Sequence, residues 1–490
     1  MKNRFALVVL SFIMFISIFT VSYASTLELQ PDTPQSAQML QQPLDEIDAA
    51  IEQSMGKREM PGAVVLVARN GKLVKHDAYG YAARYTDADF TEMEEPVAMQ
   101  KDTIFDIASM SKLFTATAVM QLWDQGKFEL DESVANYIPE FATTGKEDVT
   151  IRQLLTHTSG FRPSPATSLY KIDGTRSERL NYVLEEPLEN PPGTHYVYSD
   201  VNYITLGVLV ERLSGQRQDI YVNEHITEPL QMTDTMYNPP ETLKDRVAAT
   251  EYQPWTDRGL VWGSVHDENA WALDGVAGQA GMFSTAQDLA VFGQMMLNKG
   301  TYQGERILSE EAFGLMNTNW NEAYPGQDQG LGWELNQNWY MDGLADSNTM
   351  GHTGYTGTSI VVSPSKDTIA ILLTNRVHPT RDTPSTNPIR KKVAGKTADA
   401  INGWSAETMK ALVKKFEVNG ELDNEVAVYA LKMHLTAVSQ YEQNELPEKV
   451  IKHLEGFKLL LDHQRKNELI NDKTYQTLKR DADYLIEKWQ

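Results

Sequence analysis

Two hairpin patterns, one near each end of a long α/β-patterned block, constrain the fold of this chain most strongly. In the first, the apolar run 63–68 is followed by Asn70-Gly71, a dipeptide that favours a two-residue β-turn, and then by a second apolar pair. In the second, the apolar runs 359–362 and 368–373 flank a short turn sequence. Helical patterns fill the chain between them. This order predicts an α+β domain whose antiparallel sheet joins the two ends of the block.

Capping residues mark the ends of the helical patterns. Apolar periodicity predicts helices over 107–125 and 200–214, each followed by a glycine that can end a helix. A third pattern begins with a capping box at 284–287 and ends at Gly300. We therefore expect residues 44–403 to form one large domain with its sheet flanked by helices.

Residues 404–490 have a different character. Four amphipathic patterns without a strand signal, with apolar positions starting at Met409, Val428, Val450 and Tyr475, predict a small helical bundle. This tail has 13 basic and 15 acidic residues and so carries −2 of the net charge of −23, which leaves −21 on the first 403 residues. The acidity belongs to the large domain, and the tail is a separate, nearly neutral module.

Residues 1–24 have the pattern of a secretory signal peptide. Two basic residues precede the apolar run 5–21, and small residues stand three positions and one position before a cleavage point after Ala24. An uncleaved membrane anchor is the alternative. No later segment has 18 consecutive apolar residues. We therefore expect export to the cell envelope or the medium, a flexible lead-in at 25–43, and no stable membrane span after cleavage.

Composition excludes several classes of protein. The chain has no cysteine, which removes disulfide frameworks, cysteine-bound zinc or iron–sulfur sites, and thiolate nucleophiles. A surface with 67 acidic and 44 basic residues repels phosphate, so nucleic acid is not an expected partner.

The first candidate for chemistry is Ser109-Met110-Ser111-Lys112, which has the form S-x-x-K and heads an apolar helical pattern. Residues three apart lie on one face of a helix, so the Ser109 hydroxyl and the Lys112 amine can meet. Serine becomes a nucleophile when a base takes its proton, and an amine does this when its pKa is depressed. Alone, the motif is weak, because a solvated pair on a helix has the same spacing.

Two further motifs supply what a serine acyl-transfer site needs. Tyr198-Ser199-Asp200 stands in a loop that opens a helix, and 351–355 (Gly-His-Thr-Gly-Tyr) leads into a strand. A base on one wall and an edge strand that donates a backbone N–H on the other would complete the site. The set resembles the penicillin-recognising serine hydrolases, in particular the class C β-lactamase branch with its S-x-x-K, Y-x-N and K-T-G motifs.

Further strings at 126–131, 154–160 and 281–285 also resemble this branch, so that the resemblance spans residues 60–376. It implies a β-lactamase/transpeptidase-like fold with an antiparallel sheet and an added all-helical lobe. It also implies hydrolysis through an acyl-enzyme, with no cofactor.

The resemblance assigns a role to each matching residue. It makes Ser109 the acylated nucleophile, and Lys112 and Tyr198 the groups that share its proton. The N–H groups of Ser109 and Tyr355 would form the oxyanion hole, and His352 would orient Tyr198 or a substrate carboxylate.

Substrate-binding positions follow from the same motifs, namely Thr353, Gly354 and Asp200. Asp200 replaces the family's Asn and brings a carboxylate that would repel an anionic substrate tail unless it is protonated or paired. His352 replaces the Lys of K-T-G and removes a permanent cation. Both departures argue against efficient β-lactam hydrolysis.

The segment 262–270, which contains His266-Asp267-Glu268-Asn269, is similar to a subgroup with envelope penicillin-binding proteins and a secreted N-acetylmuramoyl-L-alanine amidase. We expect His266 to lie in a polar loop that lines the cleft. A zinc site is disfavoured because the motif lacks two histidines four residues apart on a helix.

Four other residues have open roles. His157, in a Thr-His-Thr-Ser-Gly loop, is expected to be a structural hydrogen-bonding residue. Tyr170, Trp255 and Trp262 suit either an aromatic subsite for a sugar or peptide, or core packing.

The tail resembles a small helical module called FIMAH, which is found at the C-termini of secreted bacterial enzymes. Its partner stays open. The leading hypothesis for the whole chain is an exported serine hydrolase that cleaves an amide bond in peptidoglycan fragments. The alternatives are a broad carboxylesterase or D-alanyl-D-alanine carboxypeptidase of the same fold, and a penicillin-binding sensor that is acylated without turnover.

Overall fold

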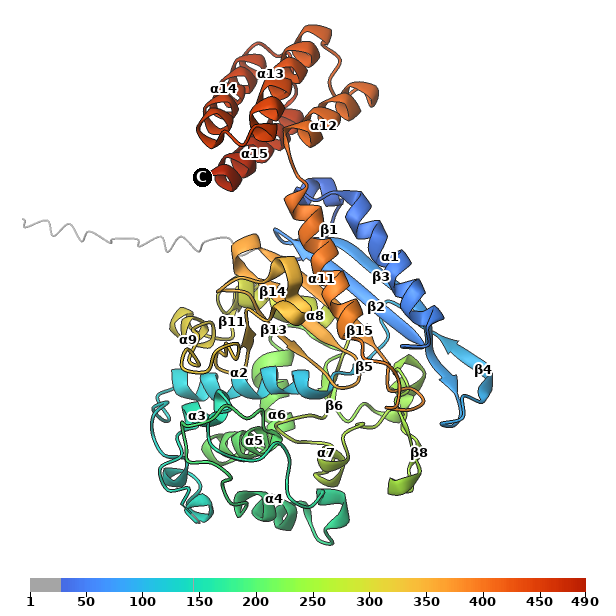
Figure 1. The fold of residues 1–490 in the computed structure, drawn as a ribbon, viewed down its shortest axis with the longest axis vertical. Helices are drawn as coiled ribbons and strands as arrows, with labels where there is room; N and C mark the ends of the chain where they lie inside the picture. The colour runs from blue at the N-terminus through green and yellow to red at the C-terminus, as the bar shows by residue number, and fades with distance from the viewer. Residues whose placement is uncertain (1–27, 144) are drawn as a thin grey trace, which may run out of the picture.

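A computed structural model describes residues 28–143 and 145–490 of the chain (Figure 1). The predicted signal peptide, 1–24, lies outside the described residues. Within them, an α+β domain is followed by a helical tail, as the sequence predicts. The tail lies beyond one end of the central sheet, and a lobe of helices lies at the opposite side (Figure 1).

The central sheet joins the two ends of the large domain. Its strand order is β1-β3-β2-β15-β14-β13-β12, and β4 pairs with β3. All pairs are antiparallel except β1 with β3. The strands are β1 (Gln30–Pro31), β2 (Gly62–Arg69), β3 (Lys72–Tyr85), β4 (Glu92–Ala98), β12 (Glu334–Leu335), β13 (Met350–Thr353), β14 (Ser359–Ser363) and β15 (Thr368–Thr374).

Both predicted hairpins are present, β2–β3 and β14–β15, and β15 pairs with β2 between them. The first turn has positive φ angles at Asn70 (53°) and Gly71 (69°), the conformation that an Asn-Gly turn adopts with little strain. Strands β2 and β15 are buried on both faces, which explains their unbroken apolar runs.

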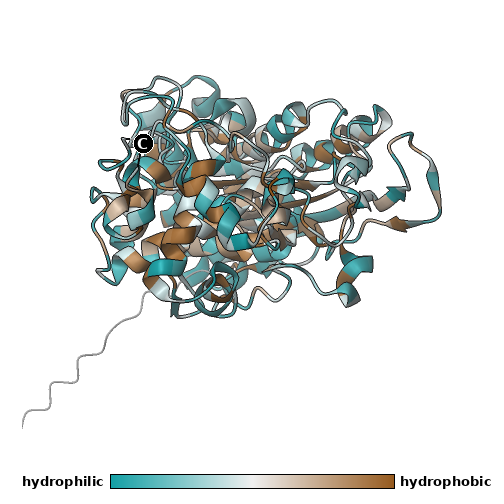
Figure 2. Cartoon of the chain, turned by 90° about the horizontal axis from the view of Figure 1, so that it is seen from below, coloured by the Kyte–Doolittle hydropathy of each residue, from teal (hydrophilic) through white to brown (hydrophobic). Residues whose placement is uncertain are grey.

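Helices cover both faces of this sheet. Helices α1 (Gln41–Gly56) and α11 (Asn387–Asn402) share a core with Val65 and Val67 of β2. The alternate side chains Val64 and Leu66 face the other core, which contains α2 and α8. Figure 2 shows the apolar segments gathered toward the middle of the molecule.

The lobe is built around the buried helices α2 and α5. Its helices are α2 (Ser111–Asp124), α3 (Ile151–Leu155), α4 (Arg176–Leu184), α5 (Asp200–Ser214), α6 (Gln218–Val222) and α7 (Glu268–Ala272). Three further helices lead back toward the sheet, α8 (Ala286–Leu297), α9 (Glu310–Met316) and α10 (Asn338–Met341). Short strand pairs connect these parts, among them β5 (Phe105–Asp106) with β9 (Met282–Ser284).

Several predicted boundaries need correction. The helix predicted from 107 begins as a 3-10 turn at Ala108–Met110 and becomes α-helical at Ser111. Helix α8 is capped by Thr285, whose side chain accepts the Asp288 N–H, so the box at 284–287 was placed one residue early.

The lead-in at 25–43 differs from the flexible segment that its composition predicts. From residue 28 onward, β1 adds a parallel strand to the sheet, and Ala37 and Met39 are fully buried. Burial of these two side chains offsets the entropy of ordering a segment rich in Gln, Pro and Ser.

The tail consists of α12 (Ala406–Val418), α13 (Glu425–Gln443), α14 (Pro447–Lys466) and α15 (Asp472–Trp489), packed around their own apolar core. Helix α15 contacts the large domain: the buried Asp481 accepts a hydrogen bond of 2.9 Å from Gln38, and the Arg69 guanidinium lies 4.7 Å from the centre of the Tyr484 ring. None of the helices in the described ranges has the length and apolarity to cross a membrane.

Candidate active site

Ser109 lies in the tight turn between β5 and α2. The preceding residue, Ala108, has a φ of +47°, a conformation that costs energy in a residue with a Cβ. The buried Asp106 carboxylate holds the turn by accepting the Ala108 N–H at 2.8 Å. The local sequence thus presents the Ser109 side chain on a constrained turn, ahead of a helix that is buried along its length.

Lys112 is fully buried, and its ammonium group has three hydrogen-bond acceptors. Its Nζ lies 3.1 Å from Ser109 Oγ, 2.8 Å from Asp200 Oδ1 and 3.2 Å from the Gln279 carbonyl oxygen. Burial by itself would lower the pKa of Lys112, but the Asp200 carboxylate and Tyr198 outweigh it and raise the pKa. The depressed pKa expected for a basic lysine is therefore absent, and Lys112 is a cation in the free enzyme.

Tyr198 completes the group around Ser109. The centre of its ring lies 4.8 Å from Lys112 Nζ. Burial raises the pKa of Tyr198, while the charge of Lys112 and the contacts of the phenol with Lys112 and Ser109 lower it. Three groups thus converge: the Ser109 hydroxyl from the turn before α2, the Lys112 ammonium from α2, and the Tyr198 phenol from the loop before α5.

His157 supports the loop that carries Tyr198. Its ring centre lies 4.5 Å from that of Tyr198, and its Nδ1 accepts the Ser199 N–H at 3.1 Å. Burial lowers the pKa of His157 well below its usual value, so the ring is neutral. This geometry fits the structural role that the sequence predicts for His157.

The third motif ends strand β13 beside the serine, with His352 and Thr353 as the last two strand residues. The sequence placed the strand after this motif, but β14 begins only at Ser359. His352 Nδ1 donates to the Thr353 carbonyl at 2.8 Å. Burial, followed by the charge of Lys112, lowers the pKa of His352 to about 3, so His352 is neutral where the family has a lysine.

Gly354 lets this motif approach the serine turn closely. A Cβ at Gly354 would lie 2.5 Å from the Ile107 carbonyl oxygen, closer than real Cβ contacts. The adjacent Tyr355 N–H and the Ser109 N–H donate no hydrogen bond within residues 28–143 and 145–490. Both donors are therefore available to a substrate oxygen.

A cavity of about 350 Å³ opens on these groups. Arg376 and Arg390 lie in its wall, and neither forms an ion pair with a carboxylate in the part of the chain that the structure describes. Burial raises the pKa of Glu334, in the same wall, to about 7. The lining residues are Ser109, Tyr198, Glu334, Trp339, His352, Thr353, Gly354, Tyr355, Arg376, Ser385, Thr386, Asn387 and Arg390.

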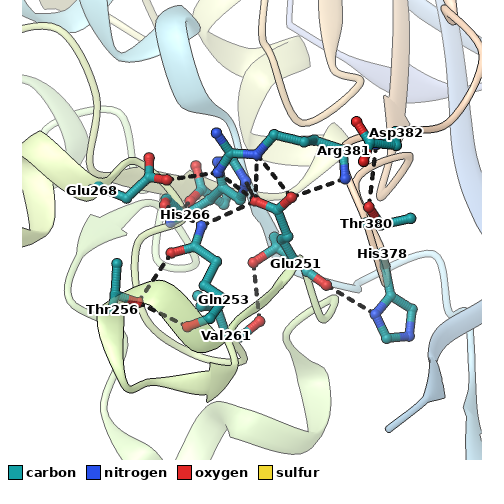
Figure 3. Close-up of polar contacts among 12 residues, drawn as sticks. Glu251, Gln253, Thr256, Val261, His266, Glu268, His378, Thr380, Arg381 and Asp382 are labelled. Atoms are coloured by element: carbon teal, nitrogen blue, oxygen red, sulfur yellow. Dashed lines mark hydrogen bonds and ion pairs between the residues drawn. The ribbon is translucent and has the colours of Figure 1, made fainter. Parts of the chain in front are cut away.

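His266 lies behind this cavity and is not part of its lining. Its Nε2 pairs with the Glu251 carboxylate at 2.9 Å (Figure 3). Its ring centre lies 5.8 Å from that of Tyr355. Its role in substrate binding stays a prediction. In the described ranges, no three His, Asp or Glu side chains are arranged to hold a metal ion.

Four charged residues of the site have no sequence motif of their own. Asp106 ties the serine turn to the His266 N–H at 2.6 Å, and Glu334, Arg376 and Arg390 define the charge of the cavity. For Arg390 the sequence offered one signal, an asparagine three residues earlier, at Asn387. In α11 the Arg390 guanidinium donates a hydrogen bond of 2.7 Å to the Asn387 side chain.

Asp267 is a further charged residue near Lys112. Its carboxylate caps α7 and accepts a hydrogen bond of 3.3 Å from the side-chain amide of Gln279, the residue whose backbone carbonyl accepts a hydrogen bond from Lys112. Burial, followed by the charge of Asp200, raises the pKa of Asp267 to about 6.

This fold and the serine, lysine and tyrosine brought together here are those of a serine hydrolase. The β-lactamase family model matches residues 47–395, and the FIMAH domain model matches residues 406–487. The chain belongs to the β-lactamase family and has a C-terminal FIMAH domain.

Two relatives have similar sequences over most of both chains. The "Putative D-alanyl-D-alanine carboxypeptidase" of Escherichia coli K12 is 34% identical over 81% of this chain and 96% of its own length. The N-acetylmuramyl-L-alanine amidase of Bacillus subtilis 168 is 32% identical over 79% of this chain and 94% of its own. Among solved structures, the hydrolase EstCE1 has the same fold, with 21% identity and a TM-score of 0.58 over 74% of this chain and 99% of its own.

Proposed function

We propose that this chain is an exported hydrolase that cleaves an amide bond in peptidoglycan fragments through an acyl-enzyme on Ser109. The observation that carries the chemistry is the position of the Ser109 hydroxyl, 3.1 Å from Lys112 Nζ and beside Tyr198, with the free N–H groups of Ser109 and Tyr355 nearby. The wall-fragment substrate rests on the names of the two relatives.

Acylation begins when Ser109 Oγ attacks the amide carbonyl carbon. The Lys112–Tyr198 pair first loses one proton to solvent, and the Tyr198 phenolate, which the neighbouring Lys112 cation stabilises, then accepts the proton of Ser109. The two N–H groups stabilise the oxyanion. The C–N bond then breaks, and the amine leaves with the proton from Tyr198.

Deacylation uses the same groups in reverse order. A water molecule attacks the Ser109 ester, and Tyr198 accepts its proton. The ester C–O bond breaks and the proton returns to Ser109 Oγ. One amide bond and one water thus yield a carboxylic acid and an amine, with the enzyme unchanged.

The charges of the cavity favour a substrate with a carboxylate outside the scissile bond. Arg376 and Arg390 supply two positive charges that no protein carboxylate pairs with in the described residues. The neutral His352 supplies none. Muropeptide stems carry such carboxylates, whereas simple esters do not, so a fragment of the cell wall suits the cavity better than an ester.

The test is to incubate the purified protein with muropeptides, D-Ala-D-Ala peptides and p-nitrophenyl esters, and to identify the products by mass spectrometry. Release of an intact stem peptide from a muramyl fragment supports the amidase. Release of D-alanine supports the carboxypeptidase, which the relative from E. coli favours. Cleavage of esters alone contradicts the cell-wall proposal. A lasting adduct on Ser109 without turnover supports a penicillin-binding sensor.

A further inference from the structure

An exposed aromatic surface adjoins the Ser109 cavity on the outer side of Tyr355. Tyr355 and Trp255 are 50% and 47% exposed. The Arg381 guanidinium lies between them, 5.1 Å from the ring centre of Trp255 and 6.0 Å from that of Tyr355. We call these three residues the rim platform. Because Tyr355 also lines the cavity, the rim platform is continuous with the catalytic site.

The rim platform is held rigidly from below. Glu251 accepts hydrogen bonds from the Arg381 backbone N–H at 2.9 Å and from its Nε at 2.8 Å, and Glu268 accepts one from Arg381 at 2.7 Å (Figure 3). The indole N–H of Trp255 also donates to Glu268, at 3.1 Å. Side chains fixed in this way lose little conformational entropy when a ligand binds.

The cation of the rim platform, Arg381, is fully paired with carboxylates. Arg381 is matched by two carboxylates, Glu251 and Glu268, and Arg376 lies 5.4 Å from the ring centre of Tyr355, so the surroundings of the platform hold no excess of charge of either sign. In the cavity, by contrast, Arg376 and Arg390 have no carboxylate partner within the described residues. Anionic groups of a substrate are therefore attracted to the cavity, and a neutral group suits the rim platform.

The three aromatic residues that the sequence offered for a subsite differ in how exposed they are. Trp262 donates its indole N–H to the Val247 carbonyl at 2.7 Å and packs on the main core, and Tyr170 also packs on that core. Trp255 keeps almost half of its surface exposed although its N–H is bonded. Of these three residues, Trp255 has the most exposed ring and is therefore the best placed to bind a ligand.

We propose that the rim platform is a subsite for the neutral pyranose ring of a muramyl fragment whose amide bond is cleaved at Ser109. The C–H face of a pyranose packs on an aromatic ring, while its hydroxyl groups reach the partly exposed side chains of Arg381 and Glu268. This inference rests on the proposed function, and it favours an amide next to the sugar over one at the end of the peptide.

The test compares two substrates with the same scissile bond, N-acetylmuramyl-L-alanyl-D-isoglutamine and D-lactyl-L-alanyl-D-isoglutamine, which lacks the sugar. We expect Trp255→Ala to lower the ratio of their kcat/KM values about tenfold. Trp255→Phe keeps a ring and should retain most of the ratio. Tyr429→Ala removes an exposed aromatic residue of the tail, and should leave the ratio unchanged.

An unchanged ratio in Trp255→Ala overturns the subsite while leaving the proposed function intact. If the wild type cleaves neither substrate, the proposed function fails, and the subsite is tested by calorimetric titration of the full-length Ser109→Ala protein with the disaccharide of N-acetylglucosamine and N-acetylmuramic acid. Binding that is lost in Ser109→Ala/Trp255→Ala supports the subsite. Absence of binding, or equal binding by both proteins, overturns it.

Discussion

Two buried ion pairs of the large domain use their charges in opposite ways. Burial alone would raise the pKa of Glu251, but hydrogen bonds from His266 and Arg381 lower it to about 2, so this carboxylate is fully matched. At the catalytic centre, Lys112 has a single carboxylate partner, Asp200. The nearby Glu334 has a pKa of about 7 because it is buried. The first pair stabilises the fold. The second pair holds the Lys112 cation beside Ser109 and Tyr198, where it can stabilise a charge formed during the reaction.

The largest effect is expected from the nucleophile itself. Ser109→Ala removes the hydroxyl that forms the acyl-enzyme, so hydrolysis of every substrate should be lost. The change removes only the Ser109 Oγ, and the shape of the turn is set by Asp106 and Ala108. The melting temperature should therefore stay near that of the wild type. Rate assays and thermal unfolding check both parts. Full activity in this variant contradicts the assignment of the site.

Gly354→Ala should lower kcat/KM by about 10²- to 10³-fold, which is the effect of removing one hydrogen-bond donor from an oxyanion hole. The added Cβ would lie 2.5 Å from the Ile107 carbonyl oxygen, and this contact forces the Tyr355 N–H away from Ser109. The measurement is kcat/KM on a short ester. Gly314→Ala is the matched control, because its Cβ meets no atom within 4 Å. Equal rates for the two variants would exclude this explanation.

Asp200→Asn removes the one carboxylate that pairs with Lys112. Asp200 raises the pKa of Lys112, and without it the effect of burial dominates and the pKa falls. Loss of a proton from the Lys112–Tyr198 pair then occurs at lower pH, so the acid limb of the pH–rate profile should move down by about 1 to 3 pH units.

The control for this shift is Asp219→Asn, which removes a carboxylate from the ion pair with Arg217 outside the site. Its acid limb should coincide with that of the wild type. An acid limb that stays in place in Asp200→Asn would show that Asp200 does not set the protonation of the site.

The sequence predicts what depends on neighbouring residues. The Asn70-Gly71 turn, the apolar runs of β2 and β15 and the periodic tail helices each carry their own signal. The three motifs of the site are local as well. The protonation of Lys112 is not set locally, because its partner Asp200 lies 88 residues away in the sequence. The position of Asp200 beside Lys112 depends on the packing of α2 on α5.

The charge of the cavity could not be predicted for the same reason. Arg376 lies in the turn after β15 and Arg390 lies in α11, and only the folded chain brings them to one wall with Glu334. Composition was misleading at the lead-in, where burial of Met39 and pairing of β1 with β3 order a polar segment. Tertiary contacts thus override local preference at both places.

Glu251→Gln should have the smallest effect on ester hydrolysis and a clear effect on stability. The pKa of Glu251 in the folded protein, about 2, is below its ordinary value of 4.5, so the ionised form stabilises the fold. This stabilisation, about 3 kcal/mol by the difference in pKa, is fully present above pH 4.5 and is lost as the pH falls toward 2.

Denaturant unfolding at a series of pH values measures this difference between the wild type and Glu251→Gln. The two free energies of unfolding should differ most at pH 7 and converge as the pH approaches 2. Glu92→Gln, in the exposed pair with Arg84, should change the free energy by less than about 1 kcal/mol at any pH. A difference that persists unchanged at low pH would mean that shape, and not charge, accounts for the role of Glu251.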